Sequence, residues 1–79
     1  MSKNKKIESI EKSIMIALCK YSEDNVDIMK NEENNMIDIM YHSRHNSFPI
    51  ISNICSAEDL TEEDIEKLVN SYNIGYAGF

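Results

Sequence analysis

The sequence predicts a small all-α protein, a bundle of about four to six helices that forms one domain over residues 1–79. Apolar residues recur at helical spacing near the start of the chain, and a helix-capping pattern precedes a second periodic run near residue 61. The isoleucines after Pro49 would suit a short strand, but no second strand pattern exists to pair with it. Helices therefore account for the chain best.

The first predicted helix runs from about Lys5 to Lys20 and has two apolar faces. A rotation of about 100° per residue gathers six side chains on one stripe: Ile7, Ile10, Ile14, Ala17, Leu18 and Tyr21. Met15, Ile16 and Cys19 lie outside that stripe. One face can pack on the rest of the chain, whereas the other needs water, a second copy or a foreign partner, and large exposed apolar patches usually mark binding surfaces. The helix indicates a protein–protein interaction.

The second predicted helix starts at a Ser22 cap and reaches about Tyr41. Its apolar stripe consists of Val26, Met29, Met36, Ile37 and Met40. Ile28 and Ile39 lie on nearly the opposite side, and the polar run 30–35 suggests a kink or break. Methionines are flexible and recur on surfaces that fit several shapes, although core packing explains them as well.

Two further helices complete the bundle. Residues 42–48 form a polar connection, and Pro49 suits the first turn of a short third helix that buries Ile50, Ile51 and Ile54. Thr61-Glu-Glu-Asp64 resembles a capping box, and apolar residues follow it at helical spacing: Ile65, Leu68, Val69 and Tyr72. We expect Gly75 to end this helix and to leave an apolar tail of Ile74, Tyr76 and Phe79.

Charge disfavours nucleic acid as a direct ligand. The net charge is −6, and six carboxylates crowd residues 58–66, whereas phosphate binding needs a basic surface. A basic protein is the more natural partner. Cys19 and Cys55 suit free thiols in a reducing compartment, and no run is long and apolar enough for a signal peptide or a membrane span, so we expect a cytoplasmic protein.

Catalytic, metal and cofactor sites are not expected. His42 and His45 are three residues apart and Cys55 lies further on, but zinc sites need three or four ligands at recurring spacings. The acidic run lacks the ligand pattern of a calcium loop and fits a solvated helix start. No nucleophile stands beside an obvious base and orienting acid. An enzyme is therefore not predicted.

Four segments are distributed along most of the chain in an order and spacing that chance explains poorly: Ile16-Ala-Leu-Cys-Lys-Tyr-Ser-Glu-Asp24, Asn46-Ser-Phe48, Leu60-Thr-Glu-Glu-Asp64 and Leu68-Val-Asn-Ser-Tyr-Asn-Ile-Gly-Tyr-Ala-Gly78. In these segments the chain resembles the AsiA family, the small anti-sigma factors and transcriptional co-regulators of T-even bacteriophages. The resemblance implies an all-helical homodimer whose apolar surface, on the N-terminal helices, is exchanged for region 4 of the host's primary sigma factor.

The implied mechanism is docking rather than chemistry. Sigma would no longer read the upstream promoter element, so host transcription would be inhibited, and phage promoters would be co-activated. The resemblance assigns the partner contacts to Ile10, Ile14, Ala17, Leu18, Lys20, Tyr21, Met36 and Met40. Ile10 stands where the family pattern has an acidic residue, which removes a possible ion pair with the basic region 4.

Two alternatives use other features of the chain. An acidic DNA mimic would inhibit another basic host protein through the carboxylates of residues 58–66, and its binding would fall steeply with salt. A structural helical homodimer would keep both apolar faces internal, and no partner would dissociate it.

Overall fold

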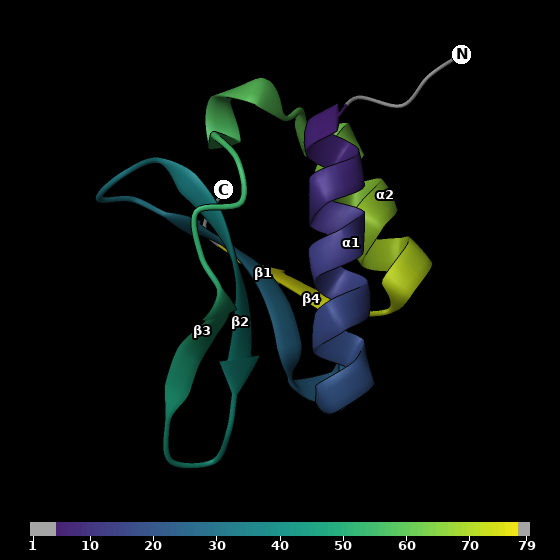
Figure 1. Cartoon of the computed structure of the whole chain (residues 1–79), viewed down its shortest axis with the longest axis vertical. Helices are drawn as coiled ribbons and strands as arrows, with labels where there is room; N and C mark the ends of the chain where they lie inside the picture. Colours follow the sequence, from purple (N-terminus) through teal and green to yellow (C-terminus); the bar gives the residue numbers. More distant parts are fainter. Residues whose placement is uncertain (1–4, 78–79) are drawn as a thin grey trace.

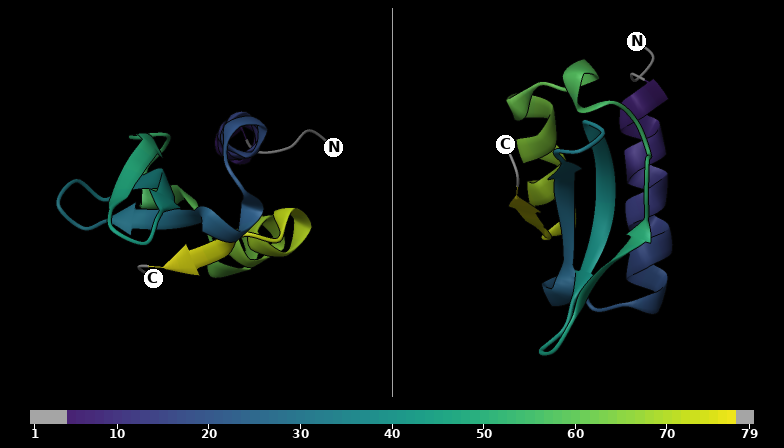
Figure 2. Two further views of the ribbon diagram at one scale, coloured as in Figure 1. Left: turned by 90° about the horizontal axis from the view of Figure 1, so that it is seen from below. Right: turned by 90° about the vertical axis from the view of Figure 1, so that its left-hand side faces the viewer.

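The computed structural model describes residues 5–77, which form a two-layer α/β domain (Figure 1). Two helices cover one face of a four-stranded sheet, and in the right-hand view of Figure 2 the strands lie in front of both helices. The elements in chain order are α1 (Lys5–Lys20), η1 (Glu23–Asn25), β1 (Val26–Asn31), β2 (Met36–His42), β3 (Ser47–Ile51), η2 (Ala57–Asp59), α2 (Glu62–Tyr72) and β4 (Gly75–Ala77). The prediction of an all-α bundle is therefore wrong.

The sheet has the order β3-β2-β1-β4. Strand β2 pairs antiparallel with both β1 and β3, whereas β4 runs parallel to β1 along its other edge. The chain reaches β4 only after it has crossed the helical layer as α2. Such a parallel pair needs a crossover connection, which a helix commonly provides.

A β-hairpin replaces the predicted second helix. Val26 and Ile28 on β1, like Ile37 and Ile39 on β2, alternate with more exposed residues and are fully buried against the helices. Ile28 and Ile39 are direct cross-strand partners. The hairpin is favoured because its two strands hydrogen-bond to each other and bury all four side chains. A helix would instead place Ile28 and Ile39 on the side opposite its apolar stripe.

Asparagines build the turn of this hairpin, at the polar run where a helical kink was expected. Asn35 has a φ of 56°, a left-handed conformation that asparagine tolerates. The side-chain oxygen of Asn31 accepts a hydrogen bond from the Glu33 backbone at 3.0 Å, and that of Asn34 accepts one from the Met36 backbone at 3.0 Å. These local bonds reverse the chain.

The predicted third helix is also wrong, because Pro49 lies within the edge strand β3. An edge strand tolerates proline, since one side of the strand needs no ladder donor. The pairing of β2 with β3 shifts register between Ile39 and Met40. Beyond β3 the chain continues along β2, where the Ile37 N–H donates to the Cys55 carbonyl at 2.9 Å.

The structure confirms helix α1 from Lys5 to Lys20 and the capped helix α2. The Asp64 N–H donates to Thr61 Oγ1 at 3.1 Å, and the Thr61 N–H donates to Asp64 Oδ2 at 3.5 Å, which completes the capping box. Asn73, with a φ of 55°, ends the helix in place of Gly75. Tyr76 belongs to β4 rather than to a tail, and Phe79 lies outside the described residues.

The core fills the space between the helices and the sheet. Its fully buried large side chains are Ile10, Ile14, Ile28, Ile37, Ile39, Ile65 and Val26. Isoleucine dominates because both layers contribute it, α1 and α2 through their inner stripes and β1 and β2 through alternate positions. Within residues 5–77, no helix covers the opposite face of the sheet (Figure 2).

Candidate protein-interaction site

Three of the predicted partner contacts belong to the core. Ile10, Ile14 and Ala17 have no exposed surface, because they form the inner stripe of α1 that packs on the sheet and α2. In this fold they lie inside the packed structure rather than on its surface. The structural role of the stripe follows from its helical spacing, but the resemblance assigned it to an external surface.

The remaining contacts on and after α1 differ from one another. Leu18 and Tyr21 are half-buried and pack against the core, whereas Lys20 is exposed. The ring centroids of Tyr21 and Tyr41 are 4.6 Å apart, and those of Tyr41 and Phe48 are 5.3 Å apart. This aromatic cluster joins the end of α1 to strands β2 and β3.

Met36 and Met40 are separated from the other predicted contacts by the sheet. They alternate with the buried Ile37 and Ile39 on β2, so they face away from the helices, and each is half-buried. The eight predicted residues therefore do not share one surface. Their assignment as partner contacts stays a prediction.

The second apolar face of α1 is exposed, as its spacing predicted. Met15 is 58% exposed and Ile16 is 44% exposed, and together with Phe48 they are the large exposed hydrophobic side chains of the described chain. Cys19, one turn beyond Met15, is also exposed. No described element packs over Met15, Ile16 and Cys19, so a partner can reach them.

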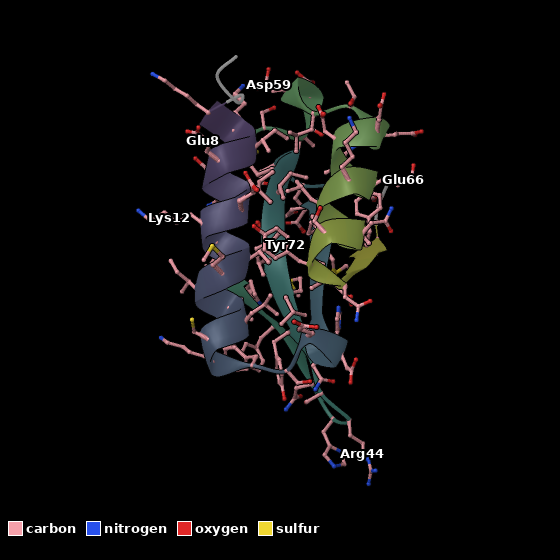
Figure 3. All side chains as sticks on the ribbon, turned by 90° about the vertical axis from the view of Figure 1, so that its right-hand side faces the viewer. Glu8, Lys12, Arg44, Asp59, Glu66 and Tyr72 are labelled. Atoms are coloured by element: carbon pink, nitrogen blue, oxygen red, sulfur yellow. The ribbon has the colours of Figure 1, made fainter. Side chains whose placement is uncertain are left out.

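A shallow groove of about 540 Å³ includes this face of α1 in its lining. Seven residues line it: Glu8, Glu11, Lys12, Met15, Ile16, Cys19 and Tyr72. Figure 3 shows Tyr72 between the two helices, with Glu8 and Lys12 on α1. Tyr72 is the contribution of α2, and its hydroxyl donates a hydrogen bond to Glu11 Oε2 at 3.4 Å. The lining thus combines apolar side chains with two glutamates and one lysine.

The acidic run near α2 is largely engaged in local structure. Glu62, Glu63 and Asp64 lie in the first turn of α2, where negative charge favours the positive end of the helix dipole. Asp59 forms an ion pair with Lys6 of α1, and Glu63 lies 3.3 Å from Lys67. These contacts fit the interpretation of a solvated helix start.

The two thiols are unlike each other. Cys55 is buried, and this burial raises the pKa of its thiol, while the nearby Lys6 acts in the opposite direction. Cys19 is exposed in the groove. Both are free, as the sequence predicted. Neither helix among residues 5–77 is long and apolar enough to cross a membrane.

The histidine-cysteine set considered for a metal does not assemble, and within residues 5–77 no three potential ligands of the His, Cys, Asp or Glu type are placed to hold an ion. His42 instead contacts Asp27 and Ser47, a grouping that sequence reasoning missed. Asp27 had been placed in a helix and the other two in a connection. Strand alternation between residues 26 and 42 was the available signal that Asp27 and His42 share one face; the sequence held no such signal for Ser47.

Comparison with protein-family models, with curated protein sequences and with solved structures found no match to this chain.

Proposed function

We propose that the protein is a docking regulator that receives a basic amphipathic helix in the groove along α1. The observation that carries this proposal is the exposure of Met15 and Ile16, at 58% and 44%, on a helix whose other face already holds the core. Apolar side chains at helical spacing form the kind of ridge on which a partner helix packs. The role needs binding and no catalysis.

Charge supports a basic partner. Glu8 and Glu11 line the groove together with one lysine, Lys12, and the whole chain carries a net charge of −6. Complementary charge speeds encounter and disfavours acidic competitors, whereas the apolar side chains of the groove supply most of the affinity. The complex should therefore persist at high salt while its association slows.

The partner we propose is region 4 of a bacterial primary sigma factor, which the resemblance to the AsiA family implies. Binding would stop sigma from reading the upstream promoter element, so the protein would inhibit host transcription in the bacterial cytoplasm and co-activate phage promoters. When no partner is bound, two copies would pair through the same apolar face. The α/β fold departs from the all-helical family, so the proposed contact moves from the buried stripe of α1 to its outer face.

The test is to mix the full chain with purified sigma region 4 and measure mass and affinity by sedimentation at low and high salt. We expect a one-to-one complex that replaces a homodimer and survives salt. Ile16→Asp should weaken it at least tenfold, because an unpaired charge in an apolar interface is costly. Asn70→Asp adds the same charge on an exposed part of α2 outside the groove lining and should bind normally.

Two results would contradict different parts of the proposal. A wild-type complex that Ile16→Asp leaves unchanged, with the variant folded by circular dichroism, would move the site away from α1. A persistent homodimer with no sigma binding would reject region 4 as the partner.

A further inference from the structure

A line of polar contacts crosses the sheet face opposite the two helices. His42 on β2 lies between Ser47 on β3 and Asp27 on β1: its Nδ1 is 2.7 Å from Ser47 Oγ, and its Nε2 is 2.8 Å from Asp27 Oδ2. His42 and Ser47 are direct cross-strand partners, whereas Asp27 lies diagonally, opposite Met40. Three adjacent strands thus hold the three groups in fixed register.

Gly75 on β4 extends this arrangement to the fourth strand. It pairs with Asp27, and a Cβ atom built on it would overlap the Asp27 carboxylate. Only glycine leaves that carboxylate its present place beside His42. The contacts therefore depend on all four strands, which sequence reasoning had not paired.

Hydrogen bonding assigns a role to each nitrogen of the imidazole. In neutral His42 the carboxylate of Asp27 accepts a bond from the Nε2–H, so Nδ1 carries the lone pair. That lone pair faces the Ser47 hydroxyl, which donates to it. Ser47, His42 and Asp27 are therefore arranged as the nucleophile, base and orienting acid of a hydrolytic triad. The two ring nitrogens are exchanged relative to the usual arrangement.

We propose that Ser47 is an activated nucleophile that attacks carboxylic esters with a phenolate leaving group. Ser47 Oγ bonds to the acyl carbon as its proton passes to His42 Nδ1, the ester C–O bond breaks, and the leaving phenolate takes that proton. Water then attacks the acyl-serine, gives a proton to Nδ1, and releases the carboxylic acid as Ser47 regains its hydrogen. Asp27 is a positioning residue in both steps.

The surroundings limit the substrate to activated esters. The side chains of His42 and Asp27 are 34% and 30% exposed, so water reaches the site and weakens its electrostatic effects. Met40 and Pro49, a facing pair on β2 and β3, lie on the same side of the sheet as His42 and Ser47 and offer an apolar surface to a small acyl group. This site is separate from the groove on α1, and its activity stands apart from the docking role.

The experiment treats the full chain with p-nitrophenyl acetate, follows p-nitrophenolate release, and locates the acetyl group by peptide mass spectrometry. We expect acetyl-Ser47, which Ser47→Ala abolishes, and about a hundredfold slower acetylation of Ser47 in His42→Gln, the loss typical of a general base. His45→Gln removes the exposed neighbouring imidazole and should leave the rate unchanged. Peptide mapping separates this adduct from any on Cys19.

The role of Asp27 is tested by the ¹⁵N NMR signals of the His42 ring. The wild type should carry its neutral proton on Nε2, and Asp27→Asn should move part of the population to Nδ1. Acetylation of Ser47 no faster than that of Ser71, an exposed serine on α2, would overturn the proposal. So would an unchanged Ser47 rate in a folded His42→Gln variant.

Discussion

Three asparagines, Asn35, Asn53 and Asn73, hold left-handed backbone conformations with φ values of 56°, 56° and 55°. Each marks a change of direction: the β1–β2 turn, the segment after β3 and the end of α2. At the second position the Asn53 N–H donates to Asp38 Oδ1 at 2.9 Å, which supplies a partner for the carboxylate of a residue that is only 7% exposed. Asparagine adopts this conformation at lower cost than most residues, so these positions tolerate few substitutions.

At Gly75 the constraint is space. Gly75→Ala should destabilise the fold by about 1–3 kcal/mol, the usual cost of overpacking, because its methyl group would displace the Asp27 carboxylate from His42. Urea denaturation of the variant and the wild type measures the difference. In an Asp27→Ala background the same substitution should cost almost nothing, and an equal cost in both backgrounds would contradict the proposed overlap.

Helix α1 works as an element with two separate apolar faces. Ile10, Ile14 and Ala17 face the core, and Ser13 between them is buried but donates its hydroxyl hydrogen to the Ser9 carbonyl at 2.9 Å. The ion pair of Lys6 with Asp59 connects the start of the helix to η2. The helix is therefore anchored along its inner face, and its outer face is left for other contacts.

This division predicts opposite effects for two isoleucines on the helix. Ile14→Ala should cost about 2–5 kcal/mol of unfolding free energy, because it leaves a cavity among fully buried side chains. Ile16→Ala, at a site 44% exposed, should change stability by less than about 1 kcal/mol. Chemical denaturation of both variants measures the contrast, and similar losses would show that the two faces are wrongly assigned.

For the whole molecule, high pH should weaken the fold through Tyr76. Burial, and secondly the nearby Glu62, raises the pKa of Tyr76 from its ordinary value of 10.0 to about 12. The unfolded chain therefore loses this proton first, and the Tyr76 contribution to stability, intact below pH 10, falls as pH rises through about 12. Denaturation curves of Tyr76→Phe should show a smaller fall over this range than those of the wild type, whereas parallel curves would argue against it.

Among the described residues, two faces on opposite sides of the core have no element packed over them. Helix α1 exposes the groove that contains Met15 and Ile16, and the sheet exposes the line of Ser47, His42 and Asp27. A two-layer fold leaves one sheet face and the outer helix surfaces open. Docking and serine reactivity can therefore be tested independently.

Local features were predictable from the residues alone. The extent of α1, the capping box at Thr61 and Asp64, the free thiols and the second apolar face of α1 all depend on neighbours within a turn or two of helix, or on single side chains. The α1 side of the groove follows in the same way from that second apolar face. The Tyr72 wall of the groove was not predictable, because α2 approaches α1 only in the folded chain.

Strands depend on partners distant in sequence, and this is where the prediction failed. The short apolar runs of residues 26–31 and 36–42 fit the residue spacing of a helix or of a strand. They form strands because Ile28 pairs with Ile39 and because β4, from the far end of the chain, pairs with β1. The sequence by itself determined the two helices, the capping box of α2 and the acidic charge. Only the tertiary structure decided the sheet, the burial of Ile10 and Ile14, and the contacts of His42 with Ser47 and Asp27. The reason is that helical spacing is a property of a local stretch of residues, whereas backbone pairing between distant strands is not.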